Sequence, residues 1–117
     1  MAPTVWYHVR NLDEGRRFYQ EVLGFSVVSR DSARAILGRD EVQIGLVLKV
    51  DHDPSKAGSI AFCVDDLETM HRVLQQSGGN PGEFGIDGWA GKQHRTFFLR
   101  ESKNGYCYCF YSPLSGA

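Results

Sequence analysis

The chain has 117 residues, of which 42% are hydrophobic and 23% are charged, and its formal net charge is −1. A chain of this size and balance buries enough apolar surface to fold as a globular domain without disulfides or metals. The near-neutral charge argues against a nucleic-acid partner or an anionic membrane surface, and no apolar run approaches the length of a membrane span.

The first half of the chain predicts the element order β-α-β-β-β. Residues 4–9, TVWYHV, are β-branched and aromatic, which is typical of a strand. Asn11 then begins an amphipathic helix as its N-cap, with Glu14 at capping-box spacing, and Gly24 ends it. Further strands are predicted over residues 25–30, 33–38 and 42–50.

The second half predicts the same order. Residues 59–64 are a strand, and residues 66–77 are a helix that glycines end. The Gly- and Pro-rich residues 78–91 hold at most a short, irregular strand. A hairpin then joins two strands, residues 94–100 and 105–111, through a turn that contains Asn104-Gly105.

A shift of 55 residues aligns the two halves. The identities at this offset are Val9 with Val64, Leu12 with Leu67, Arg17 with Arg72, Gln20 with Gln75 and Gly24 with Gly79. The element order agrees at the same offset, so we predict an α+β fold in which two tandem β-α-β-β-β modules form a curved, cupped mixed sheet. The modules are residues 3–50 and 58–113 of a single domain, 1–117, with a polar linker over residues 51–57.

The cysteine content favours a reducing compartment. Three cysteines are an odd number, and Cys107 and Cys109 are too close in one strand to pair easily with each other. The first ten residues also lack the basic-then-apolar layout of a signal peptide. We therefore expect a reduced, cytoplasmic protein.

The paired modules resemble the vicinal oxygen chelate superfamily, which includes glyoxalase I, extradiol dioxygenases, fosfomycin-resistance transferases and bleomycin-resistance proteins. The resemblance rests on FYQEVLGF at residues 18–25 and on NGYCYCFY at residues 104–111, and it covers nearly the whole chain. It implies the glyoxalase/bleomycin resistance fold and a homodimer with a ligand cleft at the junction of modules.

The resemblance places the ligands of metal-dependent members at Thr4, Gly45, Ser59 and Cys109. A catalytic divalent ion needs about three nitrogen, carboxylate or thiolate ligands. Neutral hydroxyls are poor ligands, glycine has no side chain, and one thiol does not hold the ion alone. We therefore expect no metal and no other cofactor; the alternative is a non-standard site built from His8, His94 and Cys109.

Side-chain alternation places Thr4, Trp6 and His8 on one strand face, which the resemblance makes the lining of the cup. Trp89 lies in the Gly-rich segment DGWAGK, at the expected cleft edge, where it either stacks on a planar ligand or anchors the loop. In the last hairpin we expect Phe97 and Tyr111 to face the ligand. The expected ligand-binding residues are Trp6, His8, Trp89, Phe97, Cys109 and Tyr111.

These predictions favour binding over catalysis, and no catalytic residue is identified. The bleomycin-resistance type sequesters an antibiotic without changing it, so we expect metal-independent binding of a small, planar or aromatic molecule. The first alternative is a metal-dependent enzyme of glyoxalase or dioxygenase type with non-standard ligands. The second is an accessory domain whose cleft is filled by its own side chains.

Overall fold

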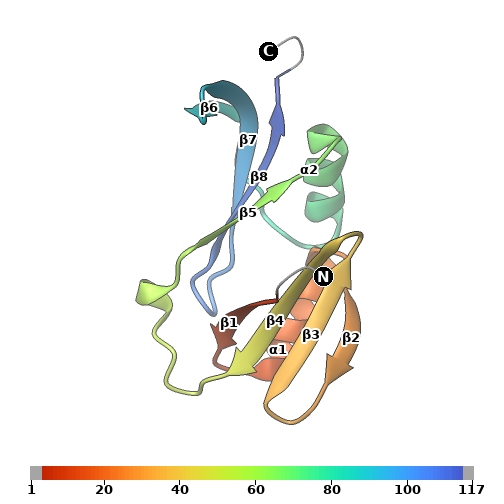
Figure 1. Cartoon of the computed structure of the whole chain (residues 1–117), viewed down its shortest axis with the longest axis vertical. Helices are drawn as coiled ribbons and strands as arrows, with labels where there is room; N and C mark the ends of the chain where they lie inside the picture. Colours follow the sequence, from red (N-terminus) through yellow and green to blue (C-terminus); the bar gives the residue numbers. More distant parts are fainter. Residues whose placement is uncertain (1–3, 115–117) are drawn as a thin grey trace. The chain divides into compact units, whose positions relative to one another are not determined.

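The structure, a computed structural model, describes residues 4–114 and divides into two compact units, Met1–Pro54 and Ser55–Ala117, called here the first and the second unit. Figure 1 shows a sheet and a helix in each. The first unit contains β1 (Val5–Val9), α1 (Leu12–Arg17), the π-helical turn η1 (Phe18–Val22), β2 (Ser26–Arg30), β3 (Arg34–Arg39) and β4 (Val42–Leu48). The second contains β5 (Ser59–Cys63), α2 (Leu67–Gln76), β6 (Gly85–Trp89), β7 (Lys92–Arg100) and β8 (Cys107–Pro113), and the 3-10 turn η2 (Pro54–Lys56) spans the boundary between the two units in the sequence.

Each unit forms a four-stranded mixed sheet with the same topology. The strand order is β1-β4-β3-β2 in the first sheet and β5-β8-β7-β6 in the second. The first and last strands of each unit are parallel neighbours, and every other pair is antiparallel. The repeated β-α-β-β-β order and the α+β fold class are therefore confirmed, and the sequence repeat is a repeat of topology.

Both helices begin at a capping side chain. The Asn11 carboxamide oxygen accepts a hydrogen bond from the Glu14 backbone N–H at 3.0 Å, as the sequence predicts. Asp66 caps α2 in the same way, accepting from the Thr69 N–H at 3.0 Å. Gly24 follows η1 with a φ of +76°, the left-handed conformation that a residue after a helix commonly adopts.

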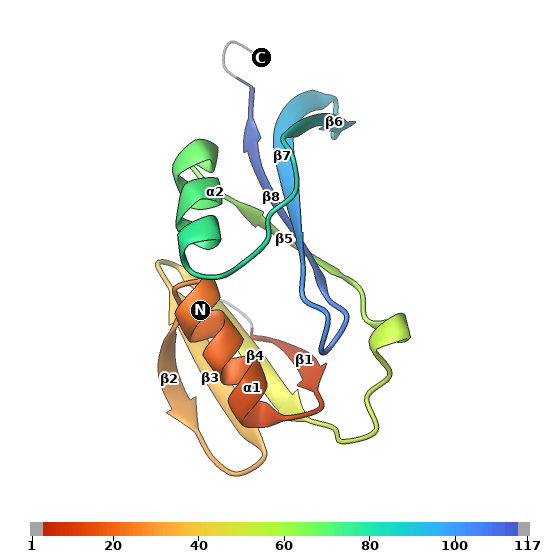
Figure 2. The ribbon, with the colours of Figure 1, turned by 180° about the vertical axis from the view of Figure 1, so that it is seen from behind.

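In the first unit, α1 packs on β3 and β4, and Figure 2 shows it lying across one face of the sheet. A Cβ atom at Gly15 would lie 2.9 Å from Cγ1 of Val9, so glycine is needed where the helix meets the sheet. The buried apolar side chains here are Val9, Tyr19, Leu23, Phe25, Ala35, Leu37, Ile44 and Leu46.

In the second unit, α2 packs on β7 and β8. The Phe97 and Phe110 rings stack at the centre of this core, with centroids 5.1 Å apart. His71 of α2 contacts the Phe97 ring edge-on at 4.9 Å, and its Nε2 lies 2.8 Å from the Gly82 carbonyl oxygen, which ties the segment after the helix to the core. The buried apolar side chains are Ile60, Leu67, Met70, Leu74, Phe97, Leu99, Tyr106, Tyr108 and Phe110.

The turn between β7 and β8 is organised by a buried carboxylate. Glu101 accepts hydrogen bonds from the backbone N–H groups of Lys103 at 2.7 Å and Asn104 at 2.9 Å. Gly105 follows with a φ of +81° and donates its N–H to the Glu101 carbonyl. The turn predicted at Asn104-Gly105 is therefore confirmed.

Among residues 4–114, no helix is both long enough and apolar enough to span a membrane.

Candidate functional site

The most distinctive surface of the second unit is the sheet face opposite α2, called here the second helix-free face. Successive strand residues point to opposite faces, so the pairing register identifies which side chains share it. Asp87 pairs with His94, Thr96 with Tyr111, and Phe98 with Cys109. The side chains on this face include those of Cys63, Asp87, Trp89, His94, Thr96, Phe98, Cys107, Cys109 and Tyr111.

Three rings on this face form an aromatic cluster: Trp89, His94 and Tyr111. The Trp89 indole stacks flat on the His94 imidazole, with centroids 3.8 Å apart and an interplanar angle of 6°. The Tyr111 ring stands edge-on to both, at 5.1 Å from Trp89 and 5.5 Å from His94. Trp89 remains 39% exposed while His94 is only 6% exposed, so Trp89 covers the imidazole and presents its other surface to solvent.

The cluster leaves one polar atom without a partner. The Nδ1 atom of His94 is buried and has no hydrogen-bond partner among the described residues. A buried polar nitrogen without a partner is costly, which makes this atom a place where a ligand or a water molecule can add a hydrogen bond.

Trp89 lies at the end of a strand rather than in a loop, which corrects the sequence prediction. It pairs with Lys92 across the two-residue connection between β6 and β7. Both connecting residues have positive φ, +54° at Ala90 and +73° at Gly91, as in the tight turns that suit a hairpin. The ladder between β6 and β7 therefore sets the position of the Trp89 backbone.

Neutral polar groups and one carboxylate surround the cluster. The Thr96 hydroxyl donates to Oδ2 of Asp87 at 3.2 Å. Burial, followed by the charges of Asp87 and Cys107, raises the pKa of the Cys109 thiol above its ordinary value of 9.0. Burial also raises the pKa of the Tyr111 phenol. Both groups stay protonated at neutral pH, so neither supplies an anionic nucleophile or base.

Phe97 does not share a face with Tyr111, and this prediction is wrong. The register places Phe97 opposite Phe110 on the side that α2 covers, where it is fully buried. Thr96 is the partner of Tyr111, and Phe98, which is 46% exposed, lies on the helix-free face. Asp87, Thr96 and Phe98 were not predicted for this face, although the alternation of side chains from Trp89 and His94 along their strands would locate them there.

The first unit has its own helix-free face, which carries Trp6 and His8. Trp6 pairs with Gly45 and lies across it, so that a Cβ atom at position 45 would overlap the indole ring. The Arg34 guanidinium lies 5.5 Å from the Trp6 ring centroid, within the range of a cation–π contact. The His8 ring is 6.3 Å from the ring of His52. The predicted site residues are thus divided between the two units.

The residues at the expected metal positions do not fit a metal ion. The place of a side chain at Gly45 is filled by the Trp6 ring, and the Thr4 hydroxyl accepts a hydrogen bond from Gln43 at 3.3 Å. Ser59 offers only a neutral hydroxyl, and the raised pKa of Cys109 disfavours the thiolate that binds metals. Within residues 4–114, no three His, Cys, Asp or Glu side chains come together as a metal site.

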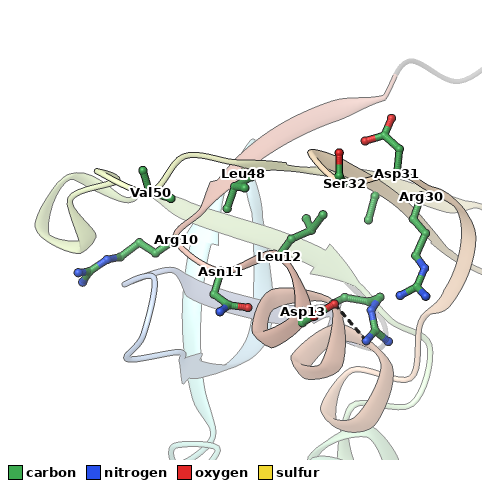
Figure 3. A pocket seen from close by; sticks show the side chains of 11 residues that line it. Arg10, Asn11, Leu12, Asp13, Arg30, Asp31, Ser32, Leu48 and Val50 are labelled. Carbon is green, nitrogen blue, oxygen red and sulfur yellow. Dashed lines mark hydrogen bonds and ion pairs between the residues drawn. The ribbon is translucent and has the colours of Figure 1, made fainter.

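A separate cavity lies in the first unit, between the start of α1, the end of β4 and the turn from β2 to β3. Its volume is about 590 Å³, and none of the predicted ligand-binding residues lines it. Figure 3 shows the lining side chains, which are Arg10, Asn11, Leu12, Asp13, Arg16, Arg30, Asp31, Ser32, Ala35, Leu48 and Val50.

Comparisons with known proteins agree with this architecture. A bleomycin resistance determinant encoded on transposon Tn5 superposes with a TM-score of 0.82 at 20% identity, covering 97% of this chain and 98% of that one. A bleomycin-binding protein in complex with bleomycin gives a TM-score of 0.80 at 19% identity, with 97% and 99% covered.

The bleomycin-binding protein of bleomycin-producing Streptomyces verticillus, in complex with copper(II)-bleomycin, gives a TM-score of 0.74 at 16% identity, with 97% and 98% covered. No curated protein matches the sequence significantly. The family model of the Glyoxalase/Bleomycin resistance protein/Dioxygenase superfamily matches residues 3–104. Because that match covers most of the sequence, the chain belongs to the Glyoxalase/Bleomycin resistance protein/Dioxygenase superfamily.

Proposed function

We propose that the chain binds a small, planar or aromatic molecule on the second helix-free face without the help of a metal. The observation that carries this proposal is the aromatic cluster. Trp89 is held flat on His94 and keeps a large exposed surface, which is the arrangement that a planar ring can stack on. The Asp87 carboxylate, which is exposed and accepts a hydrogen bond from Thr96, supplies a polar group beside the cluster that orients a ligand.

The proposal is one of sequestration rather than turnover. Cys109 and Tyr111 are protonated at neutral pH, and the residues at the metal positions do not fit an ion. Two of the similar structures are complexes with bleomycin or copper(II)-bleomycin, which makes an antibiotic of that kind the first ligand to test. A cytoplasmic location is part of the proposal, and the three free cysteines support it.

Trp6 and His8 belong to the same proposal as ligand contacts on the first unit's helix-free face. A homodimer belongs to it as well, because Trp6 is 41% and Phe98 46% exposed, and exposed aromatic side chains are enriched in protein interfaces. Light scattering on the purified protein should give twice the chain mass of 13.1 kDa. A single-chain mass at every concentration would contradict the dimer and leave the ligand proposal standing.

Isothermal titration with metal-free bleomycin, in buffer that contains EDTA, tests the ligand proposal. We expect saturable binding that weakens by about tenfold or more in Trp89→Ala, because the loss of one stacked ring lowers affinity by a factor on the order of ten. Ile86→Ala is the matched control: Ile86 lies on the same strand, is 63% exposed and points to the opposite face. Binding that needs an added divalent metal would contradict the proposal and favour the metal-dependent alternative. Binding that survives Trp89→Ala unchanged would contradict the assignment of the ligand to the aromatic cluster.

A further inference from the structure

The cavity of the first unit has the features of a second binding site. It lies outside both helix-free faces, and its volume of about 590 Å³ is within the range of small-molecule pockets. Leu12, Ala35 and Leu48 contribute apolar side chains to its lining. Its rim is charged, and the balance of those charges indicates what it binds.

Two guanidinium groups converge on the cavity from different elements. Arg16 comes from α1; its side chain is 21% exposed and its Nε atom is buried without a hydrogen-bond partner among the described residues. Arg30 comes from the end of β2, and its side chain makes no hydrogen bond or ion pair with another described residue. Figure 3 shows Arg30 reaching from the strand toward the helix that carries Asp13, whereas Arg10 extends away from the cavity.

The two carboxylates at the rim leave these arginines incompletely neutralised. Asp31 is engaged by its own turn, because it accepts hydrogen bonds from the backbone N–H groups of Ala33 at 2.8 Å and Arg34 at 2.9 Å. Asp13 contacts Arg16 at 3.5 Å but is 70% exposed, so solvent weakens this ion pair. Arg10 adds a third positive charge at the outer rim, so the lining as a whole, three arginines and two aspartates, carries a formal surplus of one positive charge.

We infer that this cavity binds a small organic monoanion, a carboxylate with an apolar body, whose carboxylate lies between Arg16 and Arg30. A monoanion matches the single surplus charge, and a planar carboxylate accepts paired hydrogen bonds from a guanidinium. The Arg16 Nη1 donates to Oε1 of Gln20 and the Nη2 contacts Asp13, so the Nε is the donor left for such a carboxylate. The apolar side chains of Leu12, Ala35 and Leu48 favour a ligand with a hydrocarbon portion over a bare inorganic ion.

Titration with benzoate, followed in nitrogen-correlated NMR spectra, tests this inference on the full chain. We expect a saturable shift of the Arg16 Nε–H signal and of the backbone amides of residues 30–32. Benzamide, which has the same shape without the charge, should leave these signals unchanged. Phenyl phosphate should bind no more tightly than benzoate, because a dianion exceeds the surplus charge of the cavity.

Arg30→Gln is the variant of choice because the side chain is exposed and its loss does not disturb the core. We expect the affinity for benzoate to fall by about tenfold, as for the loss of one charge-assisted contact. Arg100→Gln, at an exposed strand end of the second unit, should bind as the wild type does. Equal shifts with benzamide, tighter binding of phenyl phosphate, no saturable shift, or unchanged affinity in Arg30→Gln would each overturn the inference. Bleomycin binding on the second helix-free face is a separate outcome, because the two sites share no residue.

Discussion

The two units have the same topology and different helix-free faces. In the first unit, Trp6 lies across Gly45 beneath the Arg34 guanidinium. In the second, Trp89 stacks on His94 with Tyr111 at the edge of both rings. The buried faces are alike, since each presents aliphatic and aromatic side chains to one helix. The comparison teaches that the buried faces specify the fold and that the helix-free faces are where the units differ in chemistry.

The largest expected difference between the two faces of a sheet is at two neighbouring phenylalanines of β7 that point to opposite faces. Phe97→Ala removes a fully buried ring, and we expect it to lower the free energy of unfolding by about 3–5 kcal/mol. Phe98→Ala, at a side chain that is 46% exposed, should cost less than about 1 kcal/mol. Urea unfolding followed by circular dichroism measures both. Equal losses would contradict the assignment of the two faces of β7.

The next test concerns the turns between the last two strands of each unit. Glu101→Ala removes the carboxylate that binds the N–H groups of Lys103 and Asn104, and we expect a loss of about 2 kcal/mol in unfolding free energy. Glu41→Ala, in the exposed two-residue turn between β3 and β4, should leave stability within about 0.5 kcal/mol of the wild type. Urea unfolding measures both variants. If Glu101→Ala were as stable as Glu41→Ala, the turn would not depend on its carboxylate.

A smaller effect is expected at the contact between helix and sheet in the first unit. Gly15→Ala gains helix propensity, but its Cβ would lie 2.9 Å from Val9, so we expect a net loss of about 1 kcal/mol. Gly58→Ala is the control, because no atom lies within 4 Å of its Cβ position. Thermal unfolding of the pair measures the difference. A Gly15→Ala variant more stable than the wild type would show that α1 can move away from Val9 without loss of stability.

The smallest expected effect is a pH dependence of the free energy of unfolding, to which both units contribute. Backbone N–H groups of Ala33 and Arg34 lower the pKa of Asp31, and hydrogen bonds from Thr69 lower the pKa of Asp66, from an ordinary value of 3.8. A carboxyl group whose pKa is lower in the folded chain than in the unfolded chain stabilises the fold at pH values above its unfolded pKa. This stabilisation is lost as the pH falls through the folded pKa.

The free energy of unfolding should therefore fall as pH drops below 3.8. Asp66→Asn keeps a capping side chain but has nothing to titrate, so the decrease should be shallower in this variant. Urea unfolding at several pH values between neutral and strongly acidic tests this. If the free energy of unfolding of Asp66→Asn fell as steeply as that of the wild type, groups other than Asp66 would cause the acid sensitivity.

The elements that could be predicted are those with local signals. Asn11 and Gly24 bound the first helix, and Asn104-Gly105 marks the last turn, because capping and positive φ depend on the residue itself. The strand character of residues 85–89 depends instead on pairing with β7, so a glycine-rich sequence gives a weak local signal for it. The same pairing register decides that Phe98 rather than Phe97 shares the face of Tyr111.

The binding sites were predicted only in part for the same reason. Trp89 and Tyr111 were identified as single aromatic residues, but their contacts with each other and with His94 follow from the pairing of β6, β7 and β8. The cavity of the first unit combines residues from a helix start, a strand end and a turn that are separated along the sequence. No spacing pattern in the sequence predicts that these residues line one cavity.

The central claim is that the aromatic cluster binds a planar ligand without a metal. The most direct test follows the indole N–H signals of Trp6 and Trp89 in NMR spectra while metal-free bleomycin is added in the presence of EDTA. We expect a saturable shift of the Trp89 signal, with the same affinity that calorimetry gives. A Trp89 signal that stays in place, or that moves only after a divalent metal is supplied, would contradict it.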